Sequence, residues 1–158
     1  MFMPKADYVG KSIPRSDAQL KVTGRAKYGS DHYKNDMLIG CILRSPYPHA
    51  RILNIETSKA ENLKGVKSIV TGEELLCPVG MFIEDEPLLA VDYVRYVGEG
   101  VAAVAATSAD VAEEALSLIQ VEYEELPAVF DPEFAMTGDA PCVHEGRKNL
   151  ADKFCVTF

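Results

Sequence analysis

The segment 44–51, which reads RSPYPHAR, brings together side chains that could carry out chemistry. Within these eight residues stand Arg44, Tyr47, His49 and Arg51. Histidine transfers protons near neutral pH, and arginine binds carboxylates and phosphates through paired hydrogen bonds. Two prolines fix their own backbone angles and push the preceding residues away from helical geometry, so the loop is stiff. The residue types favour a strand connection or an interface built on these four side chains over catalysis.

The other reactive side chains do not form a recognised pattern. The three histidines lie in separate segments, whereas a metal site needs ligands grouped at helical or hairpin spacing. The four cysteines include no C-x-x-C pair, so we expect free thiols at Cys41, Cys77, Cys142 and Cys155. The sequence contains no G-x-S-x-G, G-x-G-x-x-G or Walker-type motif. We therefore predict no catalytic, cofactor-binding or metal-ligating residue in this chain.

Composition and charge exclude further classes. The chain has 158 residues, 47% of them hydrophobic, which suits one domain or one domain with an arm. A net charge of -8 disfavours nonspecific nucleic-acid binding, which depends on Lys and Arg neutralising phosphates. No apolar run approaches the roughly 20 residues that cross a bilayer, and no secretion signal is visible. We expect a cytoplasmic protein without nucleic-acid or membrane partners.

The elements that must position the proline-rich loop begin after an arm. Residues 1–36 are polar and show no sustained periodicity, so they read as extended, with turns at Gly24 and near 35–36. The apolar runs 37–44 and 50–56 have the length of strands. The loop then connects these two strands.

Helices and further strands follow. Residues 57–65 predict a short helix with a capping box of Ser58 and Glu61, and Gly65 suits the left-handed position after it. Residues 66–70 read as a strand. A second capping pair, Thr71 with Glu74, predicts a helical turn over 72–76, and 88–100 reads as two short strands or a bent hairpin.

The last third of the body shows the clearest periodicity. The small apolar run 101–106 predicts a central strand buried on both faces. A helix over 108–120 has one apolar stripe, and the alternating residues 121–126 indicate a half-exposed strand. The whole pattern is an α+β fold, a mixed sheet with helices packed on it.

Several long blocks give the chain a family resemblance. The blocks are VGKSIPRSDAQLKVTGRAKYGSD, LIGCILRSPYPHARILNIETSKAENLKGVKSIVTGEEL, VRYVGEGVAAVAATSADVAEEALSLIQVEYEELPAVFDPEFA and DAPCVHEGRKNL. In this order they resemble the start of the large subunit of molybdenum hydroxylases, the family of xanthine dehydrogenase, aldehyde oxidase and carbon monoxide dehydrogenase. The resemblance implies an α/β-hammerhead domain preceded by an extended N-terminal arm.

The resemblance also implies a parent enzyme. Such an enzyme hydroxylates a purine, aldehyde or aromatic substrate with oxygen from water. Molybdopterin-bound molybdenum accepts the electrons, and 2Fe-2S clusters and FAD on other domains or subunits carry them onward. The family's molybdopterin-binding loops and its catalytic glutamate lie beyond the matched region, so no family site residue transfers to this chain.

We therefore expect three parts: an arm over 1–36, a hammerhead domain over 37–135, and the start of a linker over 136–158 toward a molybdopterin-binding region. The expected partners are that region and the iron–sulfur and flavin subunits or domains. The chain would be an excised domain, a separately encoded subunit or a truncated fragment, inactive alone. The alternative is a free-standing α+β module that binds a small molecule or has a regulatory role, because fold alone does not define function.

Overall fold

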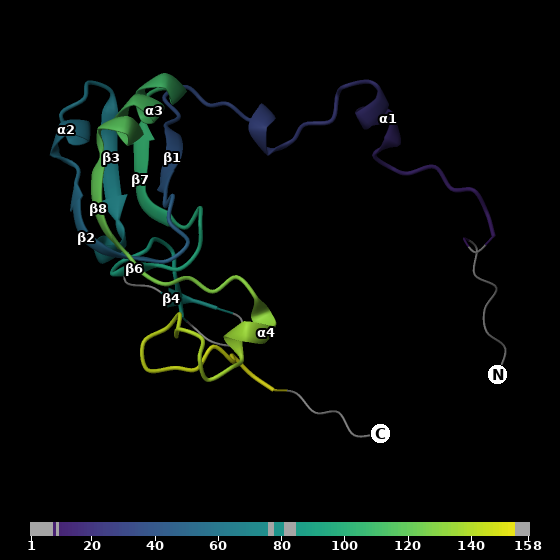
Figure 1. The fold of residues 1–158 in the computed structure, drawn as a ribbon. Helices are drawn as coiled ribbons and strands as arrows, with labels where there is room; N and C mark the ends of the chain where they lie inside the picture. The colour runs from purple at the N-terminus through teal and green to yellow at the C-terminus, as the bar shows by residue number, and fades with distance from the viewer. Residues whose placement is uncertain (1–7, 9, 76–77, 81–84, 154–158) are drawn as a thin grey trace. The chain divides into compact units, whose positions relative to one another are not determined.

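The computed structural model describes residues 8, 10–75, 78–80 and 85–153 (Figure 1). The chain divides into two compact units, Met1–Met37 and Leu38–Phe158. The first unit holds the helix α1 (Ala18–Val22) and the 3-10 turn η1 (Gly29–Asp31), neither of which buries a side chain. The sequence did not predict α1, because five residues are too few for a helical period to show.

Strands of the second unit form two three-stranded antiparallel sheets (Figure 1). The first sheet has the order β1 (Ile39–Arg44), β7 (Gly100–Ala106), β3 (Val66–Thr71). The second has the order β6 (Tyr93–Val94), β2 (Ala50–Glu56), β8 (Gln120–Glu125). A small pair adds β4 (Pro78–Val79) and β5 (Glu86–Pro87). Of the predicted segment 88–100, β6 and the start of β7 are extended.

The α+β class is confirmed, but the sheet is not the mixed one that we expected. Every strand pair of the described residues is antiparallel. A parallel pair needs a crossover that returns to the same sheet. Here the helix α2 (Ser58–Glu61) leads from β2 in the second sheet to β3 in the first, and α3 (Ala109–Leu118) leads from β7 to β8. At both helices the chain therefore passes from one sheet to the other, and neither helix connects two strands of the same sheet.

The hydrophobic core lies between β7 and α3. As predicted, β7 is the central strand of its sheet, and Val101, Ala102, Val104 and Ala106 are buried. The predicted burial of both faces is incomplete, because Ala103 and Ala105 are only half-buried. On α3, the buried side chains are Ala112 and Ala115, followed by Ile119 just after the helix. Small side chains on both elements allow the helix to approach the strand closely. A second buried cluster, at the loop end of the unit, contains Ala50, Ala90, Val94 and Val101.

The caps of α2 and α3 differ from each other. Ser108 caps α3, since its Oγ accepts a hydrogen bond from the Val111 N–H at 3.3 Å. The capping box predicted at Ser58 is wrong, because α2 begins at that residue and Thr57 precedes it. The Ser58 N–H instead donates to the Glu56 carboxylate at 2.9 Å. A neighbouring acid thus replaces the hydroxyl cap.

Two glycines are required by the backbone around β3. Gly65 has a φ of 107°, the left-handed position predicted after α2. Gly72 opens the 3-10 turn η2 (Gly72–Glu74), where a Cβ would lie 2.3 Å from the carbonyl oxygen of Ala90. The predicted capping pair of η2 is confirmed, since the Thr71 N–H donates to the Glu74 carboxylate at 3.1 Å.

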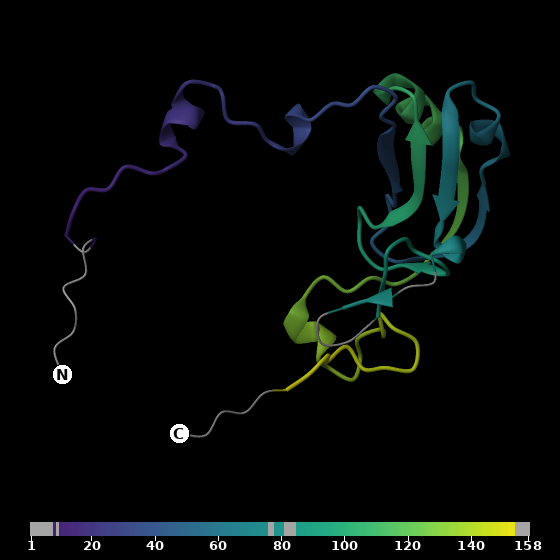
Figure 2. The same ribbon diagram turned by 180° about the vertical axis from the view of Figure 1, so that it is seen from behind.

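After β8 the chain forms the helix α4 (Pro132–Ala135), whose first turn is capped by Asp131. Figure 2 shows α4 and residues 136–153 at the end of the second unit opposite to α3. The sequence did not predict this four-residue helix. No helix in the part of the chain that the structure describes is long and apolar enough to cross a membrane.

Candidate functional site

The proline-rich loop, residues 44–51, forms the corner between the two sheets, since β1 and β2 lie in different sheets. It is tied to the turn between β6 and β7. The Ser45 N–H donates to the Glu99 carbonyl and the Gly98 N–H donates to the Ser45 carbonyl, both at 2.8 Å. The Arg44 guanidinium donates to the Gly98 carbonyl at 2.7 Å. Arg44 therefore acts as a brace between loop and turn.

Tyr47 lies inside the same corner. Its N–H donates to the Ser45 hydroxyl at 3.0 Å, and that hydroxyl donates to the Tyr47 carbonyl at 3.1 Å. The ring of Tyr47 packs on the ring of Tyr123 from β8, with centroids 5.1 Å apart and a tilt of 52°. Burial raises the pKa of Tyr123. The two rings thus form a packing contact between the proline-rich loop and the second sheet.

His49 is buried, with 7% of its surface exposed. Its Nδ1 lies 2.8 Å from the carbonyl oxygen of Pro127, so the ring donates its Nδ1–H, because a carbonyl only accepts. The Leu126 N–H donates back to the His49 carbonyl at 2.9 Å. The imidazole thus fastens the end of β8 to the loop.

Arg51 faces a different environment. It lies on β2 opposite Tyr93 of β6 and Glu124 of β8. With these residues and Glu145 it lines a cavity of about 300 Å³, to which His49 also contributes. The Tyr93 hydroxyl donates to the Glu145 carboxylate at 2.7 Å, and this bond raises the pKa of Tyr93. The structure therefore brings Arg51 and His49 to one cavity, while Arg44 and Tyr47 do not line it.

Sequence reasoning missed a buried carboxylate beside the loop. Glu99 is 6% exposed, and its carboxylate accepts the Arg95 N–H. Burial raises the pKa of Glu99. The Arg95 guanidinium lies 5.8 Å from the centre of the Tyr93 ring. The sequence feature that pointed to this buried carboxylate was the motif VGEG, in which an acid stands between two glycines just before a buried strand.

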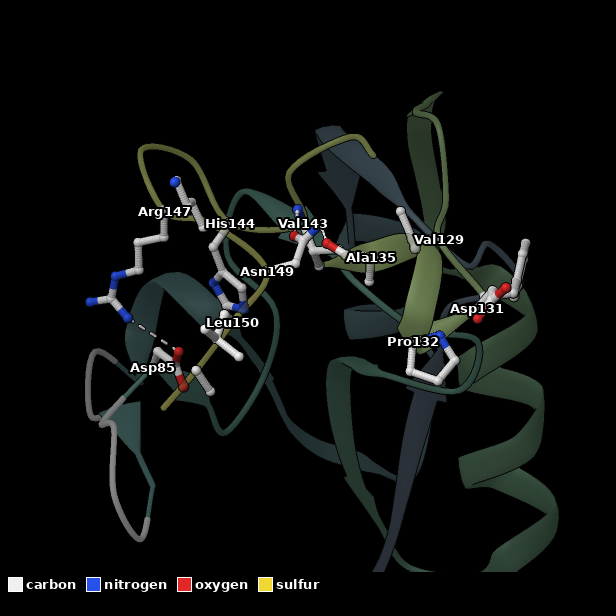
Figure 3. A pocket seen from close by; sticks show the side chains of 13 residues that line it. Asp85, Val129, Asp131, Pro132, Ala135, Val143, His144, Arg147, Asn149 and Leu150 are labelled. Carbon is white, nitrogen blue, oxygen red and sulfur yellow. Dashed lines mark hydrogen bonds and ion pairs between the residues drawn. The ribbon is translucent and has the colours of Figure 1, made fainter. Parts of the chain in front are cut away.

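A larger hollow of about 790 Å³ lies beside the C-terminal residues (Figure 3). Arg147 pairs with Asp85 at 3.3 Å on one wall. Asn149 holds the backbone together: its amide donates to the carbonyls of Ala135 and Pro141 and its oxygen accepts from a third residue. Sequence reasoning missed this hollow, because its walls come from separate segments to which no element was assigned.

Metal-ligating side chains are not gathered at these cavities. Within residues 8, 10–75, 78–80 and 85–153, no three His, Cys, Asp or Glu side chains are grouped so as to hold a metal ion. Cys41 is half-buried on β1 and Cys142 is exposed, and both are free thiols. Cys77 and Cys155 lie outside the described residues.

The fold and the corner loop define a hammerhead domain. Residues 23–127 match the family described as aldehyde oxidase and xanthine dehydrogenase, a/b hammerhead domain. This range is more than half of the chain, so the chain belongs to that family, the hammerhead domain of molybdenum hydroxylase large subunits. The family resemblance read from the sequence is confirmed.

Similar proteins and solved structures support the same family assignment. A probable xanthine dehydrogenase subunit from Bacillus subtilis (strain 168) is 47% identical over 83% of this chain and 18% of its own length. The nicotinate dehydrogenase large molybdopterin subunit of Eubacterium barkeri is 39% identical over 86% of this chain and 32% of its own length. The crystal structure of quinoline 2-oxidoreductase from Pseudomonas putida 86 superimposes with a TM-score of 0.75 and 41% identity, covering 83% of this chain and 18% of that one. The chain spans less than a third of the length of these relatives.

Proposed function

We propose that this chain is the N-terminal hammerhead part of a molybdopterin-dependent hydroxylase or dehydrogenase of the xanthine dehydrogenase type, with a structural and interface role. One observation carries the proposal. The match covers 83% of this chain but only 18% of the Bacillus subtilis relative, so most of such an enzyme lies outside the matched region. In this proposal 37–135 is the hammerhead body, 1–36 the arm and 136–158 the start of the linker.

The contacts of the proline-rich loop support a structural role. Arg44 and His49 donate hydrogen bonds to backbone carbonyls of the same domain, and Tyr47 packs on a tyrosine of the second sheet. These contacts connect segments of one domain to each other, as expected of side chains that hold a corner of the fold together. Arg51 is exposed and lines a cavity, which suits contact with a neighbouring domain.

The names of two relatives support the proposed cofactors and partners. A relative from Escherichia coli O157:H7 is described as a xanthine dehydrogenase molybdenum-binding subunit, and one from Paenarthrobacter nicotinovorans as subunit gamma of a dehydrogenase complex. We assign molybdopterin-bound molybdenum to the rest of the large subunit, and 2Fe-2S clusters and FAD to further domains or subunits. When bound, the molybdenum cofactor would accept the electrons that the substrate loses. The residues of this chain form the hammerhead domain, on which the rest of the large subunit and the other subunits assemble.

The test is reconstitution. The tagged chain is co-expressed with the molybdopterin-binding region of the same enzyme as a separate polypeptide, and with the iron–sulfur and flavin partners. We expect the partners to copurify with the tag, the complex to contain molybdenum, and the chain purified alone to contain none by metal analysis. Stoichiometric molybdenum or pterin in the lone chain, or no association with the partners, would overturn the proposal. A tightly bound metabolite in the lone chain would favour the free-standing binding module.

A further inference from the structure

Large apolar side chains gather on the surface at the loop end of the second unit. Tyr96, Val97, Phe130 and Leu150 are 58%, 62%, 83% and 55% exposed. The first three line one hollow of about 230 Å³, and Phe130 with Leu150 lines the hollow of about 790 Å³. Phe130 therefore stands at the boundary of two hollows and joins the four side chains into one surface, called here the Phe130 face.

This face is built on anchored backbone. Tyr96 and Val97 lie in the turn that the Arg44 guanidinium and the Ser45 backbone hold, and the Glu99 N–H donates to the Tyr96 carbonyl at 3.2 Å. Phe130 follows the backbone that His49 fastens at Pro127, and Leu150 follows Asn149, whose amide bonds two carbonyls. A surface fixed in this way loses little freedom when a partner binds, and such preorganisation favours affinity.

We propose that the Phe130 face binds an apolar segment of the rest of the large subunit. This inference rests on the proposed function and names the surface through which that function would operate. Exposed apolar side chains gathered around hollows mark interaction sites, and a ring as exposed as that of Phe130 gains most from being covered. The relatives carry most of their length outside the matched region, which supplies the polypeptide to cover it.

Two rival occupants make different predictions. A second copy of this chain would bury the same side chains in a dimer, whose population rises with concentration. A small aromatic molecule would fill the hollow near Phe130 without any protein partner. The large-subunit segment requires neither, and it predicts that the lone chain is a monomer whose Phe130 face becomes protected only in the complex.

The experiment compares three forms of the tagged chain. Phe130→Asp places a charge on the face, and Leu53→Asp makes the same change at a residue of β2 that is 56% exposed and lines neither hollow. The probe is the molybdopterin-binding region of the same enzyme, expressed as a separate polypeptide. We expect Phe130→Asp to weaken its binding about tenfold or more, while Leu53→Asp binds as the unmodified chain does. Circular dichroism and a thermal melt of each variant show that it is folded.

The outcomes separate the two proposals. If the unmodified chain does not bind the molybdopterin-binding region, the proposed function fails and this inference with it. If the unmodified chain binds but folded Phe130→Asp binds equally well, the Phe130 face is not the contact and the proposed function stands. If Phe130→Asp does not fold, Tyr96→Asp, on the turn between β6 and β7, replaces it under the same criteria. Light scattering that shows a dimer abolished by the substitution would assign the face to a second copy.

Discussion

Replacing His49 with alanine tests whether the proline-rich loop is a structural corner. The side chain is 7% exposed, and its ring donates a hydrogen bond to the Pro127 carbonyl at 2.8 Å. Removing the ring loses packing contacts worth about 2 kcal/mol, the low end for buried large-to-small changes, because imidazole is partly polar. The lost hydrogen bond adds about 0.5–1 kcal/mol, since Pro127 is exposed and water can reach its carbonyl. We expect His49→Ala to lower the free energy of unfolding by about 2.5–3 kcal/mol.

The assay is urea unfolding of the isolated chain. Because the chain has no Trp and 7 Tyr, circular dichroism and tyrosine fluorescence are the suitable probes. His49→Asn is the matched control, since its amide nitrogen takes about the position of Nδ1 and should restore about 0.5–1 kcal/mol. If His49→Ala unfolds within about 0.5 kcal/mol of the unmodified chain, the ring does not fasten the loop and the structural interpretation is wrong.

Activity gives a second, independent readout of His49. In the reconstituted enzyme, His49→Ala should reduce the fraction assembled but leave hydroxylation per bound molybdenum unchanged. A histidine that moves protons during catalysis typically contributes about a hundredfold or more in rate. A variant that assembles and loads molybdenum normally but turns over about a hundredfold slower would therefore place His49 on the substrate path.

Three further predictions concern the loop, the arm and a buried acid. Replacing Pro46 and Pro48 together with alanine should cost about 1–2 kcal/mol in the same urea assay, because each proline restricts the unfolded chain; an unchanged midpoint would contradict this. Amide hydrogens of residues 1–36 should exchange faster than those of β7, which hydrogen-exchange mass spectrometry measures, because α1 and η1 bury no side chain; equal protection would count against it. Burial raises the pKa of Glu99, so its contribution to stability is present at pH below its unfolded pKa and is lost as the pH rises through its folded pKa. Relative to Glu99→Gln, the unmodified chain should lose stability as the pH rises from about 4 toward neutral, and parallel pH profiles would refute this.

Local patterns determined most of the elements. Six consecutive small apolar residues predicted β7 as a central strand, and they do form the middle strand of the first sheet. The stripe at i, i+3, i+4 and i+7 specifies α3, and the Thr71–Glu74 pair specifies where η2 begins, because caps act within three residues. The predicted capping box at Ser58 is wrong because a second acceptor lies within the same short range. The Ser58 N–H donates to the carboxylate of Glu56. The family and the order of the longer elements, from β1 to β8, were thus readable from the sequence, whereas the short helices α1 and α4 were not.

Only the tertiary structure decided how the loop is used. The sequence places Arg44, Tyr47, His49 and Arg51 together but does not say which of them face inward. His49 finds its acceptor 78 residues away, and Arg44 finds its own 54 residues away. Both choices depend on β1 and β2 joining different sheets, which is set by long-range strand pairing. The role of each side chain depends on which backbone group lies within hydrogen-bond distance of it. Residue type and spacing along the chain do not reveal that group.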